Sequence, residues 1–144
     1  MTVNQLSVFV ENKPGRLSEI TSILQQQNVD IRALSVADTT HFGILRLIVD
    51  KPSQAETALK EAGFTVSLTK VIAIGVSDRP GGLAEALAVL SGGGISVEDM
   101  YAFISREEKT AYVILRVDDI DKAVGLIQKS SIPLLTEDEI IHGK

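Results

Sequence analysis

The stretch Glu11-Asn12-Lys13-Pro14-Gly15-Arg16-Leu17 occurs again, in altered form, as Ser77-Asp78-Arg79-Pro80-Gly81-Gly82-Leu83. The two prolines are 66 positions apart (80 − 14), close to half of the 144-residue chain. Each copy follows an alternating apolar run and precedes a segment with helical periodicity, in which the proline is expected at an early helical position. A turn of this kind leaves backbone N–H groups at a helix N-terminus, where they attract a negatively charged group. The sequence therefore predicts two small binding modules in tandem.

The duplication continues beyond this motif. With the same offset of 66, the alternating residues Leu6, Val8 and Val10 match Ile72, Ile74 and Val76. After residue 40 the better offset is 68, since Leu45, Leu47 and Val49 then match Val113, Leu115 and Val117. The change predicts two extra residues in one hairpin, for which the segment 105–109 is the natural place. We expect a first domain at 1–70 and a second at 71–144, with the last strand of the first passing almost directly into the first strand of the second.

Apolar periodicity gives both halves the same order of elements. In the first half it predicts strands near 6–10, 31–38, 42–50 and 64–68, with helices near 17–24 and 55–62. In the second half it predicts strands near 72–76, 95–105, 109–117 and 132–136, with helices near 83–90 and 123–127. The order β-α-β-β-α-β predicts an α+β fold of two ferredoxin-like domains in tandem, each with two helices on one face of an antiparallel sheet.

Composition excludes several classes of protein. A net charge of −5, a pI near 5.0 and only four Phe, two Tyr and no Trp argue against a nucleic-acid partner. The absence of cysteine excludes disulfides and thiolate metal sites. No apolar run approaches the roughly 18–20 residues that cross a bilayer, so no membrane partner is expected. The first residues do not resemble a signal peptide, and we expect a cytoplasmic protein.

Catalytic chemistry has little support in the sequence. His41 and His142 lack a recognisable serine or carboxylate arrangement and are expected on the surface. The run 92–94 of three glycines leaves a helix instead of opening one, which indicates a helix stop and not a phosphate loop. The acidic run 118–121 is expected to cap a helix. We expect no cofactor and no metal, and an enzyme is the least supported function.

Several apolar residues are expected on the sheet faces that the helices leave uncovered. They are Phe9, Ile44 and Ile48 in the first half and Tyr112 and Ile114 in the second. Such a surface is too apolar to face water, and a second copy of the chain is the simplest partner. We therefore expect a homodimer.

The repeated turn and the element order resemble those of the ACT domain, a small amino-acid-binding regulatory module. The helix-exit segments 27–31 and 93–97 also look like those of this family, and the resemblance covers nearly the whole chain. It implies that the two sheets join side by side with the helices on one face, and that an amino-acid effector binds where a turn of one domain meets the helix exit of its neighbour.

Carried onto this chain, the resemblance implies two sites. The first comprises Asn12, Lys13, Pro14, Gly15, Arg16 and Leu17, facing Gly94 and Ser96. The second comprises Asp78, Arg79, Pro80, Gly81, Gly82 and Leu83, facing Asn28 and Asp30. In amino-acid-binding members both polar positions are often Asn, whereas here they are Asn12 and Ser96 at one site and Asp78 and Asp30 at the other. The two sites are thus chemically unequal, and the first is expected to be the better one.

Simpler interpretations stay open at this stage. Asn12 and Asp78 are residue types that stabilise turns and cap helices without any ligand. Lys13, Arg16 and Arg79 are typical solvated charges. The sequence favours an amino-acid-binding sensor without its own catalytic domain, which reports to a separate metabolic enzyme or regulator. The alternative is a ligand-free interaction or assembly module on the same fold.

Overall fold

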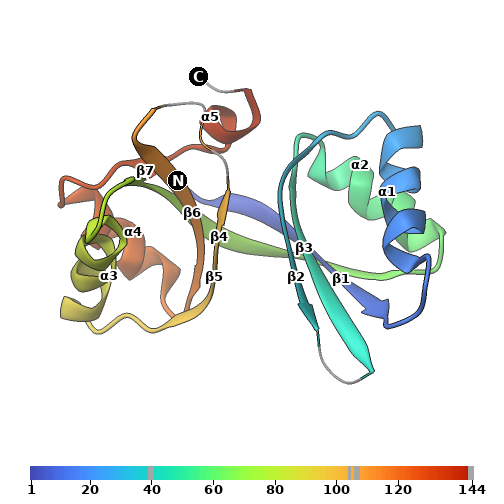
Figure 1. Cartoon of the computed structure of the whole chain (residues 1–144), viewed down its shortest axis with the longest axis horizontal. Helices are drawn as coiled ribbons and strands as arrows, with labels where there is room; N and C mark the ends of the chain where they lie inside the picture. Colours follow the sequence, from blue (N-terminus) through green and yellow to red (C-terminus); the bar gives the residue numbers. More distant parts are fainter. Residues whose placement is uncertain (39–40, 104, 106–107, 143–144) are drawn as a thin grey trace. The chain divides into compact units, whose positions relative to one another are not determined.

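The structure is a computed structural model, and it describes residues 1–38, 41–103, 105 and 108–142 (Figure 1). The chain divides into two compact units. The first unit is Asn4–Thr69, and the second is Lys70–Lys144 together with Met1–Val3. Residues 39–40 of the first predicted hairpin, and residues 106–107 of the predicted insertion, lie outside the described residues.

The first unit follows the predicted order of elements. Its elements are β1 (Val3–Glu11), α1 (Arg16–Gln26), β2 (Ile31–Asp38), β3 (Phe42–Val49), α2 (Pro52–Glu61) and the start of β4 (Thr65–Ser77). β3 pairs antiparallel with both β1 and β2, and β4 is the neighbour of β1, which gives the strand order β2-β3-β1-β4. The helices of this unit, α1 and α2, cover one face of the sheet (Figure 1).

The second unit repeats this order. After the end of β4 come α3 (Gly82–Gly92), β5 (Val97–Phe103), β6 (Thr110–Val117), α4 (Ile120–Gln128) and β7 (Leu134–Leu135). β6 pairs antiparallel with β4 and β5, and the short β7 pairs with β4, so the order is β5-β6-β4-β7. The predicted α+β fold with β-α-β-β-α-β repeated twice is confirmed.

A further helix, α5 (Glu137–His142), follows β7 and was not predicted. The Thr136 hydroxyl accepts a hydrogen bond from the Glu139 N–H over 3.1 Å and donates one to the Glu139 carboxylate over 3.2 Å. This resembles the reciprocal pairing of a capping box, a signal that Thr-Glu-Asp-Glu carries in the sequence. The predicted strand near 132–136 is correspondingly shorter.

β4 belongs to both units. Its 13 residues continue from the first unit into the second without a turn. The prediction that the last strand of one half passes almost directly into the first strand of the next is therefore confirmed. The six consecutive residues from Val71 to Val76 are all buried.

Each unit has its own hydrophobic core, built from the residues that the alternating and helical patterns predicted. Ile20 and Leu24 of α1 pack on Leu6 and Val8 of β1 in the first unit. Ala86 and Leu90 of α3 occupy the equivalent positions in the second core. Leu17, at the start of the same helical pattern, differs, since its exposed fraction is 44%.

The apolar residues that were expected on the uncovered sheet faces differ in how deeply they are buried. Ile48 and Ile114 are buried, Ile44 is partly buried, and Phe9 has an exposed fraction of 53%. Tyr112 packs on Phe103, with ring centroids 5.3 Å apart.

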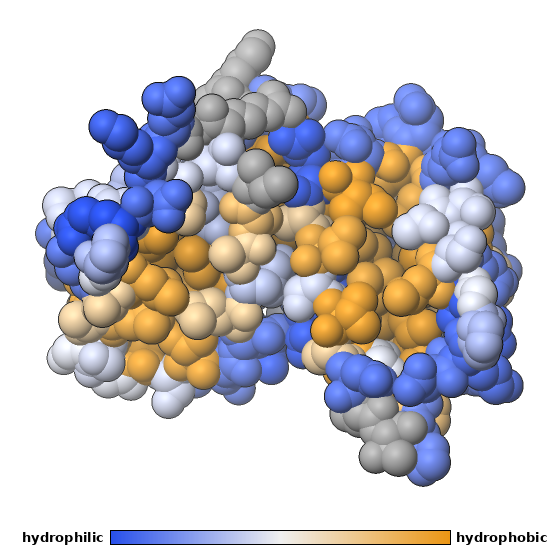
Figure 2. Space-filling model, viewed as in Figure 1, coloured by the Kyte–Doolittle hydropathy of each residue, from blue (hydrophilic) through white to orange (hydrophobic). Residues whose placement is uncertain are grey.

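Other exposed apolar residues, which the sequence analysis did not single out, lie on β2 and β5, the strands at the two ends of the strand order. Leu34 and Val36 of β2 are 54% and 48% exposed, and Met100 of β5 is 41% exposed. Leu34 pairs with Leu47 and Met100 pairs with Leu115, so these side chains lie on the helix-covered face. Figure 2 shows hydrophobic surface between β2 and α1 in the first unit and between β5 and α3 in the second.

Candidate functional site

The first strand–helix turn is fixed by backbone hydrogen bonds. The Lys13 N–H donates to the Glu11 carbonyl over 2.8 Å, and the Asn12 N–H donates to the His41 carbonyl over 3.2 Å. α1 then begins after Gly15, whose φ of 87° favours glycine. Pro14 precedes this residue, so the prediction that it occupies an early helical position is wrong. It belongs to the turn.

The second turn has the same backbone pattern. The Arg79 N–H donates to the Ser77 carbonyl over 2.9 Å, and the Asp78 N–H donates to the Lys109 carbonyl over 2.7 Å. Gly81 precedes α3 with a φ of 90°. Pro80 again lies in the turn and outside the helix. The two turns are therefore equivalent in backbone, and they differ in side chains.

Neither α1 nor α3 has a side-chain hydrogen bond at its N-terminus. Capping by Asn12 and Asp78 is therefore not what these residues do in this structure. The first-turn N–H groups of both helices are left without a side-chain partner, and they carry the partial positive charge of a helix N-terminus.

The polar residues of the two turns have different surroundings. The Asn12 side chain donates a hydrogen bond from Nδ2 to Oδ1 of Asp38, over 3.3 Å. Asp38 ends β2, and the position 66 residues further on is Ile104, outside the described residues. Within the described part of the chain, the Asp78 carboxylate has no hydrogen bond or ion pair. Asp38 is a site residue that the sequence analysis missed.

Charged side chains surround the first turn. Lys13 contacts Glu11 over 2.9 Å, while Arg16 contacts Glu19 over 3.1 Å and Glu11 over 3.9 Å. The hydrogen bond from Lys13, together with the charges of Lys13 and Arg16, lowers the pKa of Glu11. Glu11 is therefore ionised at neutral pH.

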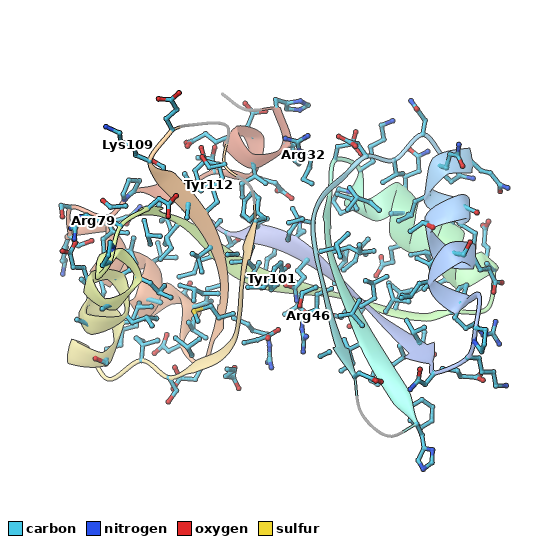
Figure 3. All side chains as sticks on the ribbon, in the orientation of Figure 1. Arg32, Arg46, Arg79, Tyr101, Lys109 and Tyr112 are labelled. Carbon is cyan, nitrogen blue, oxygen red and sulfur yellow. The ribbon has the colours of Figure 1, made fainter. Side chains whose placement is uncertain are left out.

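Among the described residues, the second turn has one ion pair of this kind. Arg79, labelled beside α3 in Figure 3, contacts Glu85 over 2.6 Å and donates a hydrogen bond to the Pro80 carbonyl over 3.2 Å. Its guanidinium is directed along the turn and the first helical residues, and this engagement reduces its availability to a ligand.

A cavity of about 250 Å³ lies against the first turn. It brings together four of the predicted site residues, Asn12, Lys13, Arg16 and Leu17, with Asp38. Val10, Val36 and Gly43 form other parts of its wall, as does Glu11. Pro14 and Gly15 shape the turn but do not line this cavity. The site thus has apolar side chains on one part of its wall and both signs of charge on another.

The second turn is closed by a tight backbone contact. Gly82 lies so close to the Ser77 carbonyl oxygen that no Cβ fits there, and Gly82 is itself buried. The equivalent residue of the first turn is Arg16, which carries a full side chain. Leu83 is partly buried and packs against the second core, whereas its equivalent Leu17 is exposed.

The predicted helix-exit residues form a second pair of equivalent structures. Asn28 and Gly94 both have positive φ, of 55° and 78°. The Asp30 N–H donates to the Asp50 carboxylate over 2.9 Å, and the Ser96 N–H donates to the Asp118 carboxylate over 3.0 Å.

The carbonyls of the same residues complete these links. The Asp30 carbonyl accepts from the Asp50 N–H over 3.2 Å, and the Ser96 carbonyl accepts from the Asp118 N–H over 3.1 Å. Asp50 and Asp118 thus fix the two exits. Asp118 belongs to the acidic run that was expected to cap a helix, and within that run it is Asp119 that caps α4.

Within one unit, the turn and the helix exit lie at opposite ends of the same helix. The 11 residues of α1 separate them by about 16 Å. Asn28 and Asp30 line a different cavity, of about 550 Å³, beside Asp50 and the last turns of α1. The pairing of each turn with the exit of the other half stays a prediction.

A family model for the ACT domain pair matches residues 1–142. The chain belongs to the ACT domain pair family. The predicted recognition is confirmed, and the pair occupies nearly all of the sequence given, with no separate catalytic domain within the match. A search of curated proteins found no match.

Solved structures of similar proteins agree with the family. The crystal structure of protein BT0572 from Bacteroides thetaiotaomicron matches with a TM-score of 0.92 and 38% identity, covering 97% of this chain and 96% of that one. The ligand-free regulatory subunit of aspartate kinase from Thermus thermophilus matches with a TM-score of 0.63 and 16% identity, covering 88% and 91%. Aspartate kinase from Synechocystis matches with a TM-score of 0.58 and 21% identity, covering 89% of this chain and 26% of that one. At these lower identities the likeness concerns the fold.

No helix among the described residues is long and apolar enough to span a bilayer. The same residues contain no group of three or more His, Cys, Asp or Glu side chains arranged to hold a metal ion.

Proposed function

We propose that this ACT domain pair is a cytoplasmic sensor that binds a free amino acid at its first turn and reports its level to a separate enzyme or regulator. The observation that carries the proposal is the cavity of about 250 Å³ at this turn. It is smaller than the roughly 300–1,000 Å³ typical of drug-sized ligands, which suits a ligand of amino-acid size.

The two ends of an amino acid find complementary groups in this cavity. The α-carboxylate is assigned to the uncapped N–H groups at the start of α1, with Lys13 nearby. The α-ammonium is assigned to Asp38, with the side-chain carbonyl of Asn12 as a second acceptor. The exposed face of Leu17, together with Val36, provides an apolar contact for the ligand side chain.

The second turn is proposed as the weaker site. Ionised Asp78 repels a carboxylate that approaches the start of α3, and Arg79 is held by Glu85. The tight contact between Gly82 and Ser77 also removes the place that Arg16 occupies in the first turn. The exits around Asn28, Asp30, Gly94 and Ser96 remain proposed ligand neighbours.

A thermal-shift screen of the 20 amino acids tests the proposal. A ligand present at 100 times its dissociation constant adds about 2.7 kcal/mol of stability, which raises the melting temperature of a protein this size by roughly 5–10 °C. For the best ligand, calorimetric titration should show that Asn12→Ala weakens binding about tenfold.

The matched control is Asp78→Ala, at the equivalent position of the second turn, which should change the affinity less than threefold. Equal losses in the two variants would show that the turns are equivalent and that the asymmetry is wrong. No shift with any amino acid would favour the second candidate function, a ligand-free assembly module. The exposed apolar residues Leu34 and Met100 are the observation in favour of that candidate.

A further inference from the structure

A further cavity in the first unit has aromatic walls. It has a volume of about 300 Å³ and shares only Glu11 and Arg16 with the cavity at the first turn. Its other walls include Phe9, Phe42 and Phe64, three of the four phenylalanines in the chain. We call it the phenylalanine pocket. Ala62, Gly63 and Thr65, next to the end of α2, complete its lining.

Two of these aromatic side chains are so exposed that they add little to the stability of the fold. Phe9 and Phe42 have exposed fractions of 53% and 54%. An exposed aromatic ring gains little from the hydrophobic effect, which stabilises a protein in proportion to the apolar area removed from water. Only Phe64 packs against the core of the unit.

The second unit shows that the fold does not need this pocket. The residues equivalent to Phe9 and Phe42 there are Gly75 and Thr110. The Gly75 N–H donates to the Pro133 carbonyl over 3.0 Å. The Pro133 ring would lie 3.7 Å from a Cβ added at Gly75, so the chain itself occupies the space next to this strand. At the positions of Phe9 and Phe42, the second unit therefore has no aromatic side chain.

The charges in the wall select among ligands. The carboxylate of Glu11 and the guanidinium of Arg16 are 3.9 Å apart, and each has a closer partner elsewhere, in Lys13 and Glu19. A cation is repelled by Arg16, and an anion is repelled by Glu11. A molecule that carries both an ammonium and a carboxylate group can pair with Glu11 and Arg16 at once.

We propose that the phenylalanine pocket binds a small zwitterion with an aromatic ring, of which an aromatic amino acid is the simplest form. The ring packs on Phe9, Phe42 and Phe64 in offset or edge-to-face geometry. This ligand occupies a cavity different from the one proposed for the sensor function, so either proposal can be correct without the other. Glu11 and Arg16 line both cavities, but the sensor proposal assigns them no contact with its ligand.

Titration of the ¹⁵N-labelled protein with L-phenylalanine, followed by NMR, tests this site. The amide signals of Phe42, Gly63 and Thr65 should move and saturate. L-Phenylalaninamide, which lacks the carboxylate, and N-acetyl-L-phenylalanine, which lacks the ammonium, should each bind at least tenfold more weakly. Shifts centred on Asn12 and Gly43, which belong to the other cavity, would overturn the assignment to this pocket, as would equal affinity for all three molecules.

A substitution with a matched control completes the test. Phe42→Thr introduces the residue found at the equivalent position of the second unit, and it should weaken L-phenylalanine binding about tenfold. The control Leu68→Thr removes another exposed apolar side chain that does not line the pocket, and it should leave the affinity within twofold. Unchanged affinity in a folded Phe42→Thr variant, or absence of binding to the unaltered protein at millimolar L-phenylalanine, would overturn the proposal.

Discussion

Gly82, the first residue of α3, lies against the carbonyl oxygen of Ser77 so closely that no Cβ fits between them. The obstacle is backbone, which cannot rotate away as a flexible side chain does. Replacement by alanine must therefore move the start of α3 away from the end of β4. The equivalent residue in the first unit is Arg16, where a side chain is present.

This contact predicts unequal effects of alanine at the two positions. Gly82→Ala should lower the free energy of unfolding by about 1–3 kcal/mol, since forcing atoms into a packed site has costs of that size. Arg16→Ala should lower it by less than about 1 kcal/mol, because it removes only partly exposed ion pairs. Urea denaturation of both variants measures the difference. Equal losses would mean that the second turn relaxes freely.

At the two helix exits, equivalent substitutions should instead lower the free energy of unfolding equally. The carboxylates of Asp50 and Asp118 accept hydrogen bonds from the N–H groups of Asp30 and Ser96 in the same geometry. Asp50→Ala and Asp118→Ala should each lower the free energy of unfolding by about 1–3 kcal/mol, as expected when a charged acceptor is lost. Hydrogen exchange should quicken at the amide of Asp30 in one variant and at that of Ser96 in the other. Unchanged exchange would contradict the bonding described here.

The shared strand β4 predicts that the two units unfold together. Leu24 and Leu90 are equivalent buried residues of the two cores, and replacement of either by alanine should lower the free energy of unfolding by about 2–5 kcal/mol. In both variants scanning calorimetry should show one transition at a lower temperature. A second transition that keeps the original melting temperature would show that one unit remains folded without the other.

The exposed apolar residues of β2 predict self-association. Leu34→Lys should shift the chain toward the monomer, as measured by light scattering at micromolar concentration. The reason is that a charge on an apolar edge strand such as β2 opposes pairing with another chain. Leu68→Lys is the control, since Leu68 is an exposed apolar residue of β4. A monomer before substitution would refute the expected homodimer, and dissociation by both variants would place the interface elsewhere.

Much of the fold could be predicted from sequence, because periodicity and the repeated turn report on local geometry. β2 has the predicted bounds, and the expected helix stop at residues 92–94 is confirmed by the end of α3 at Gly92. The helix α5 was missed because its six residues are too few for periodicity to appear, although the capping residue Thr136 was present. The prolines were expected inside the helices, whereas each lies in the turn, because a glycine with positive φ immediately precedes each helix.

Less of the candidate site could be predicted from the sequence. Asp38 is 26 residues from Asn12, and only the pairing of β2, β3 and β1 brings the two side chains together. Phe9, Phe42 and Phe64 are equally scattered along the sequence. The exposure of Leu34 depends on its place at the end of the sheet order, which an alternating pattern does not reveal.

The single strand β4 has a consequence for how this chain can be divided. The boundary between the units, at Thr69 and Lys70, falls inside the 13 residues of this strand, so a cut at the boundary divides a continuous strand. Proteases that prefer exposed loops find no loop at this boundary. The junction between the two units is therefore expected to resist limited proteolysis while the chain is folded.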